Sequence, residues 1–165
     1  MDELKLSMLG GLRIFVGNSA DLTAVLSSNK KAQAILCYLV LNNHTHYRTQ
    51  LAEKFWPDNP PRLGQGSLRV SLNALKTVGL DAYLLVKHNT LAFDQASTYW
   101  CDVEAFERLL ARHNRGEHDA GNMELLRQAV DLYGGDFSGR GFCWVTRLNL
   151  MIGSWVSANI GGRWF

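Results

Sequence analysis

The sequence predicts an α+β N-terminal region followed by an all-α C-terminal region. Three observations predict it: residues 4–17 alternate as short strands do, three helical patterns follow them, and two short apolar runs at 83–93 follow the helices. After Gln95 only helical patterns remain. With 47% hydrophobic and 19% charged residues among 165, the chain can bury a core.

The first elements are strands and an amphipathic helix. "LKLSMLGGLRIFVG" at residues 4–17 predicts a short antiparallel start that turns at Gly10 and Gly11. Residues 27–43 predict a helix, because apolar side chains recur there at i, i+3, i+4, i+7 and i+8. These side chains are Ala32, Ile35, Leu36, Leu39 and Val40. A Ser or Asn that precedes them is available as the N-cap.

Two more helices and a hairpin complete this region. Residues 47–61 predict a short second helix that ends before Pro57, since the residue before a proline disfavours helical backbone. Residues 60–80 predict a third helix, opened by two prolines and closed by a glycine. Residues 83–93 predict a β-hairpin with a polar tip. The tip comprises Lys87, His88 and Asn89.

One side of the third helix is basic and rich in amides. At 100° per residue, its polar residues fall within a sector of roughly 80°. They are Arg62, Gln65, Arg69, Asn73 and Lys76. No carboxylate lies between Pro60 and Leu80. Strands, three helices and a hairpin, in this order, are typical of a winged helix-turn-helix, whose last helix enters the DNA major groove. This side is therefore predicted to read DNA, because Arg, Asn and Gln bind base edges and phosphates.

The C-terminal region predicts two amphipathic helices, at residues 102–116 and 122–137. The apolar side of the first comprises Val103, Phe106 and Leu110. The apolar side of the second comprises Met123, Leu126, Val130 and Tyr133. Joined by a short turn around Gly116, they would form an all-α, tetratricopeptide-like helical hairpin.

Charge and motif content point away from catalysis. The net charge is only +2, but residues 1–94 carry ten Lys/Arg against seven Asp/Glu, while residues 95–165 carry seven against eight. An anionic partner is therefore expected on the first half. No Ser or Cys nucleophile has a recognisable base partner, and no carboxylates are paired by motif. We predict no catalytic residues, no metal, no cofactor and no enzyme activity.

Cysteine spacing and hydropathy bear on the compartment. Cys37, Cys101 and Cys143 lack metal or redox spacing and predict reduced thiols. The histidines of "HTH" at residues 44–46 are interpreted as loop residues rather than a metal pair. The first 20 residues lack a signal peptide, and no apolar run is long enough to span a bilayer. A cytoplasmic protein without a membrane partner is expected.

Two blocks stand in a specific order: "QLAEKFWPDNPPRLGQGSLRVSLNALK" and then "CDVEAFERLLARHNRGEHDAGNMELLRQAVDLYGGDF". Together with "SMLGGLRIFV" and "LLVKHNTLAF", they resemble bacterial transcriptional activators of the SARP type. These proteins join an OmpR-like winged-helix domain to a bacterial transcriptional activator domain, the BTAD. The resemblance covers residues 4 to about 141. It implies a winged-helix DNA-binding domain at 1–94 and a partial BTAD with an atypical tail at 95–165.

The resemblance implies sequence-specific binding to double-stranded promoter DNA, often by paired protomers, and activation through contact with RNA polymerase. The recognition helix would be 62–78 and the wing 83–93. The implied DNA-binding residues are Arg62, Gln65, Ser67, Arg69, Asn73, Lys76, Lys87 and His88.

The chain also departs from the family pattern. Tyr47 stands where the second helix usually has a Ser cap, which costs a capping bond. After Gly141 the resemblance fades into an aromatic tail, which suggests a truncated member or one whose end is read out of frame. We expect such a chain to form a homodimer or to aggregate, because an apolar side of its helical hairpin would stay uncovered. Two alternatives stay open. Instead of a DNA-binding regulator, the chain would be a helical-repeat adaptor that binds protein, or a non-functional fragment of a larger regulator.

Overall fold

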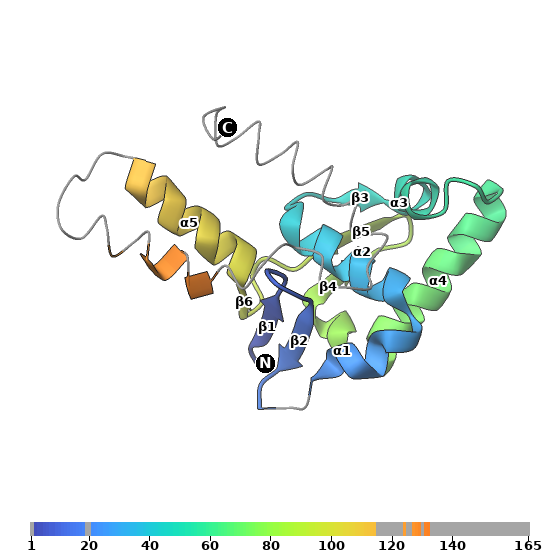
Figure 1. Cartoon of the computed structure of the whole chain (residues 1–165). Coiled ribbons are helices and arrows are strands. Elements are labelled where there is room, and N and C mark those ends of the chain that lie inside the picture. The colour runs from blue at the N-terminus through green and yellow to red at the C-terminus, as the bar shows by residue number, and fades with distance from the viewer. Residues whose placement is uncertain (1, 19–20, 115–123, 125–126, 130, 133–165) are drawn as a thin grey trace. The chain divides into compact units, whose positions relative to one another are not determined.

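The computed structural model describes residues 2–18, 21–114, 124, 127–129 and 131–132. These residues form a mixed α+β protein with two small sheets, as the sequence predicts for its first half (Figure 1). The chain divides into two compact units. One contains residues 1–5 and 14–99, and the other contains residues 6–13 and 100–165. The first unit thus runs to Tyr99, beyond the boundary that the sequence places at residue 94.

The first sheet is built from three short strands in the order β2-β1-β6. They are β1 Leu4–Ser7, β2 Arg13–Val16 and β6 Tyr99–Cys101. Strand β6 lies in the region that the sequence predicts to be all-α, so that prediction is wrong at residues 99–101, which pair with β1 instead. Leu4 and Leu6 on β1 are fully buried and Lys5 between them is exposed, the alternation expected of a strand with one covered side. Gly10 and Gly11 lie between β1 and β2 with φ of 81° and 146°, which a side chain would disfavour.

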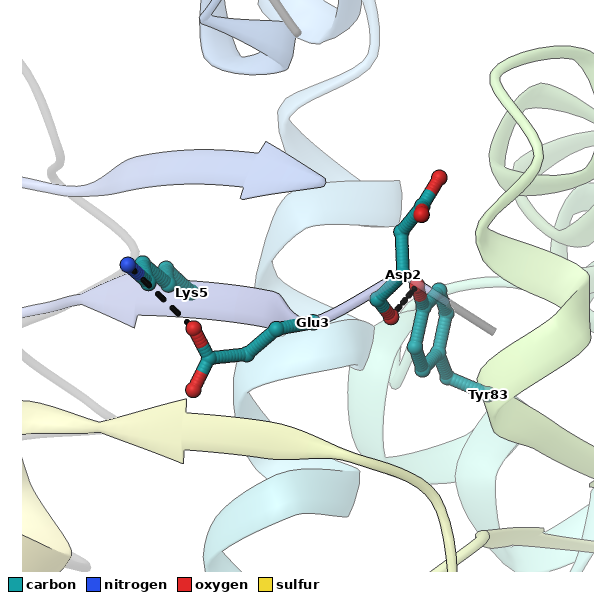
Figure 2. Close-up of polar contacts among 4 residues, drawn as sticks. All are labelled: Asp2, Glu3, Lys5 and Tyr83. Atoms are coloured by element: carbon teal, nitrogen blue, oxygen red, sulfur yellow. Dashed lines mark hydrogen bonds and ion pairs between the residues drawn. The ribbon is translucent and has the colours of Figure 1, made fainter. Parts of the chain in front are cut away.

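Two polar contacts surround the start of β1 (Figure 2). The hydroxyl of Tyr83 donates to the main-chain carbonyl of Asp2 at 2.7 Å, and the Tyr83 side chain is itself buried. The ammonium of Lys5 lies 3.2 Å from a carboxylate oxygen of Glu3, and both side chains are well exposed. The first contact ties the N-terminus to the segment that contains Tyr83, whereas the second is a surface ion pair.

Helix α1 Leu22–Val25 and a 3-10 helix at Leu26–Ser28 precede α2 Lys30–Leu41. Asn29 is the N-cap of α2, since its side-chain oxygen accepts a hydrogen bond from the N–H of Ala32 at 3.0 Å. The predicted apolar residues of α2 are all buried. The helix is not amphipathic, however, because every residue from 32 to 40 is buried, including Gln33 and Tyr38. A helix covered on all sides has no exposed stripe.

Helices α3 Arg48–Phe55 and α4 Pro61–Thr77 pack against each other (Figure 1). Helix α3 ends before Pro57 as predicted, and α4 begins with Pro at its first position. Gly64 lies at the crossing, where a Cβ would stand 3.5 Å from the Cβ of Ala52. Gly79 follows α4 with φ of 77°, the left-handed conformation that ends many helices.

The second sheet contains the predicted hairpin. A 3-10 helix at Leu80–Tyr83 leads into β4 Leu84–Val86, which pairs antiparallel with β5 Thr90–Phe93 in the register Leu84↔Phe93. The sequence did not predict the third strand, β3 His46–Tyr47. It pairs with β5 on its other edge, giving the order β3-β5-β4. This pairing fixes the hairpin beside the start of α3, because α3 follows β3 directly.

The second unit contains α5 Asp102–Asn114, which begins where the sequence predicts. Val103 is buried and Phe106 is half-buried, as expected for the apolar side. Asp102 is buried, and its carboxylate accepts hydrogen bonds from the N–H groups of Met8, Leu9 and Val103 at 2.7, 2.9 and 2.8 Å. The predicted helix at 122–137 falls mostly outside the described residues, and so does the aromatic tail.

Candidate nucleic-acid interface

Helix α4 separates its buried and exposed residues sharply. Its buried residues are Gly64, Leu68, Ser71 and Leu75. The predicted reading residues are all exposed: Arg62, Gln65, Arg69, Asn73 and Lys76. The core therefore takes one side of α4 and leaves the basic, amide-rich side to solvent. Ser67, which the family resemblance also implied, is half-buried and lies apart from this sector.

A groove of about 770 Å³ runs beside the N-terminal half of α4. Arg62, Gln65 and Arg69 line it from α4, and His88 lines it from the hairpin tip. Its other lining residues are Tyr47, Arg48, Thr49, Gly66, Leu68 and Asn89. None of these lining residues is an Asp or Glu. The groove is thus lined by cations, and a bound anion would meet no carboxylate that repels it.

A second groove of about 480 Å³ runs beside the C-terminal half of α4. Asn73 and Lys76 line it, and Asp81 is its single acidic lining residue. Arg48 and Arg69 line both grooves. Because these two arginines are shared, the two grooves form one continuous surface along α4. We call this surface, made of the lining residues of both grooves, the α4 face.

Hydrogen bonds hold the hairpin tip against the start of α3. The main-chain N–H of Arg48 donates to the carbonyl of Asn89 at 2.9 Å, and the N–H of Lys87 donates to the carbonyl of Thr90 at 2.9 Å. The side chains of His88 and Asn89 contact each other at 2.6 Å between Nδ1 and Oδ1. The tip therefore lies beside the start of α3, and His88 lines the first groove. Lys87 is exposed but lines neither groove.

Arg48 is the main residue of the α4 face that sequence reasoning missed. It is the first residue of α3 and lies outside α4, the helix whose periodicity predicts the reading residues. Its position beside Arg69 comes from the crossing of α3 and α4, which no sequence spacing encodes. The signal that existed was a lone cation at the predicted start of a helix, where Asp or Glu would complement the helix dipole better.

The far end of α3 is fixed by Lys31 of α2. The Lys31 ammonium donates to the carbonyl of Phe55 and lies 5.3 Å from the centroid of the Trp56 ring. Burial lowers the pKa of Lys31 to about 8, although the nearby Asp58 carboxylate acts in the opposite direction. An ammonium at a helix C-terminus satisfies a free carbonyl and favours the helix dipole. Both ends of α3 are therefore held by other elements.

The "HTH" segment is only partly a loop. His46 lies in β3 and is buried, with its ring centroid 5.0 Å from that of Tyr38 and 3.9 Å from that of His44. Burial and the neighbouring His44 lower the pKa of His46. Within the described residues, no group of three or more His, Cys, Asp or Glu side chains is placed to hold a metal ion. In that part of the chain no helix is long and apolar enough to cross a membrane.

No protein-family model matches the chain, and no curated protein matches its sequence significantly.

Proposed function

We propose that this chain is a sequence-specific DNA-binding regulator that activates transcription at promoters. The observation that carries the proposal is the α4 face. Arg62, Arg69 and Arg48 reach its first groove from two helices, and no carboxylate lines that groove. Phosphates and base edges of a duplex are the groups that guanidinium and amide side chains bind.

The proposed architecture is a winged helix-turn-helix. Helices α3 and α4 would form the helix-turn-helix, and the β4–β5 hairpin would be the wing. With 17 residues, α4 is roughly 25 Å long, enough to lie across a major groove with its polar side inward. Membership of the SARP family and a tetratricopeptide-like BTAD belong to the same proposal, as do a cytoplasmic location and RNA polymerase as the partner.

Salt dependence is the first test. The full chain is selected against a random duplex pool, and the selected duplex is titrated at two salt concentrations. Each phosphate contact is expected to add about 0.9 to the slope of log affinity against log salt. Absent or salt-insensitive binding would contradict the proposal and favour an adaptor that binds protein.

The second test separates base contacts from phosphate contacts. Arg69→Ala and Asn73→Ala are expected to weaken selected-site binding by roughly 1–3 kcal/mol each. Lys87→Ala is expected to cost less and to lower affinity similarly for all sequences. Lys5→Ala is the control, because it removes one positive charge from β1 and because Lys5 lines neither groove. If Arg69→Ala leaves both circular dichroism and affinity unchanged, the reading side is misassigned.

A further inference from the structure

Gly66 is a glycine that the fold does not explain. It lies inside α4, is exposed, and a Cβ built there would meet no atom within 4 Å apart from its chain neighbours and the nearby backbone of α4 itself. Glycine is among the poorest helix formers and alanine is the best, so the chain gives up helix stability at this position. Gly64 differs, because it is buried against Ala52 where α3 crosses α4.

The position of Gly66 on the helix is equally specific. At 100° per residue, Gly66 and Asn73 lie opposite the buried row of α4, so they form its outermost line. Arg62 and Arg69 flank this line on one side, and Gly66 itself lines the cationic groove. On the other side Val70 is 63% exposed. Along the outermost line of α4, the helix surface is therefore closest to the helix axis at Gly66, which has no side chain.

We propose that Gly66 is the point of closest approach between α4 and a DNA duplex. The inference rests on the proposed function and deepens it, since it assigns a positioning residue that touches no core atom. Without a Cβ at this point, α4 can sit deeper in the major groove. Arg62 and Arg69 then reach the base edges while Arg48 reaches a phosphate. The occupant is a duplex rather than an apolar partner, because arginines line this groove without any carboxylate and the phosphates of a duplex would neutralise them.

Stability and binding should respond to a side chain at residue 66 in opposite directions. An alanine there meets open space and improves helix propensity, so the melting temperature should rise by about 2–4 °C. A leucine would hold the helix away from the groove floor. Its affinity for the selected duplex should fall by about tenfold or more, the effect of breaking at least one base contact.

The experiment compares Gly66→Ala and Gly66→Leu with wild type, all as full chains, by thermal melting and by titration of the selected duplex. Ala24→Leu is the matched control, because Ala24 is also small, exposed and helical but lines neither groove. The expected result is lost affinity in Gly66→Leu, a smaller loss in Gly66→Ala, no loss of melting temperature in either, and unchanged affinity in Ala24→Leu.

Failure of this inference is distinguishable from failure of the proposed function. If wild type binds no selected duplex, the proposed function itself is overturned. If wild type binds and Gly66→Leu binds equally well, only the role of Gly66 is overturned. A fall in melting temperature in Gly66→Ala would also overturn it, because the glycine would then serve the fold.

Discussion

The main-chain N–H of Arg48 donates to the carbonyl of Asn89 at 2.9 Å. This bond satisfies one of the free N–H groups at the start of α3, where Tyr47 offers no side-chain cap. A Ser at position 47 would accept from the N–H of the second or third residue of α3, so the hairpin tip satisfies a different N–H group and the cap missing at Tyr47 is not replaced. As a consequence of the bond, the tip lies beside Arg48, whose side chain lines both grooves of the α4 face.

Arg48 is therefore expected to be a phosphate contact. Arg48→Gln should lower affinity by a similar factor for selected and unselected duplexes, because phosphates carry no sequence information. The slope of log affinity against log salt should fall by about 0.9. Titrations at three salt concentrations measure both quantities, with Lys5→Gln as a charge control on β1. A loss confined to the selected duplex would instead make Arg48 a base contact.

The two contacts in Figure 2 should differ in their effect on stability. Tyr83→Phe removes the bond to the Asp2 carbonyl inside a buried environment, so unfolding free energy should fall by about 0.5–1.5 kcal/mol. Lys5→Gln breaks an exposed ion pair with Glu3 and should change it by less than about 0.5 kcal/mol. Urea unfolding of both variants measures the difference. Equal losses would show that the Tyr83 bond adds nothing beyond a surface pair.

Local signals in the sequence were sufficient for α2, α3, α4 and the hairpin, but not for the short helix α1. Pro57 ends α3, Pro61 opens α4, Gly79 follows it, and Asn29 caps α2, and each of these acts within a few residues. The exposed polar sector of α4 followed from periodicity alone, because one buried row was enough to orient the helix.

Features that depend on tertiary contacts were missed. Strand β3 has two residues and exists only because β5 offers an edge to pair with. The burial of residues 32–40 of α2 depends on elements that cover the helix from several sides, so its partial apolar period was misleading. Arg48 joins Arg69 because α3 crosses α4. None of these relations can be derived from spacing along one segment.

Among the described residues of the second unit, Asp102 should be the most sensitive polar residue. Asp102→Ala would leave the N–H groups of Met8 and Leu9 without their acceptor, and each such loss costs about 1–3 kcal/mol. Asp102→Asn keeps one acceptor oxygen and should cost less. Urea unfolding followed by circular dichroism ranks the variants. If Ala and Asn are equally destabilising, the negative charge rather than the acceptor geometry holds these N–H groups.

Lys31 gives the chain a specific response to alkaline pH. The pKa of Lys31 is about 8 in the folded chain, against 10.5 when unperturbed, because burial disfavours the ammonium. Between these values the unfolded chain binds more protons than the folded one. The Lys31 contribution to stability should therefore rise from pH 8 to pH 10.5, and it should be constant below pH 8.

Comparison with Lys31→Met isolates this contribution, since groups such as Tyr and Cys titrate in both proteins and cancel. The unfolding free energy of wild type minus that of Lys31→Met should increase as pH rises from 8 to 10. Urea titration of both proteins at each pH measures this difference. The loss of the bond to the Phe55 carbonyl adds a pH-independent offset and leaves the slope unchanged. A difference that stays flat over this range would mean that Lys31 keeps its ordinary pKa, and that the end of α3 is more hydrated than its burial indicates.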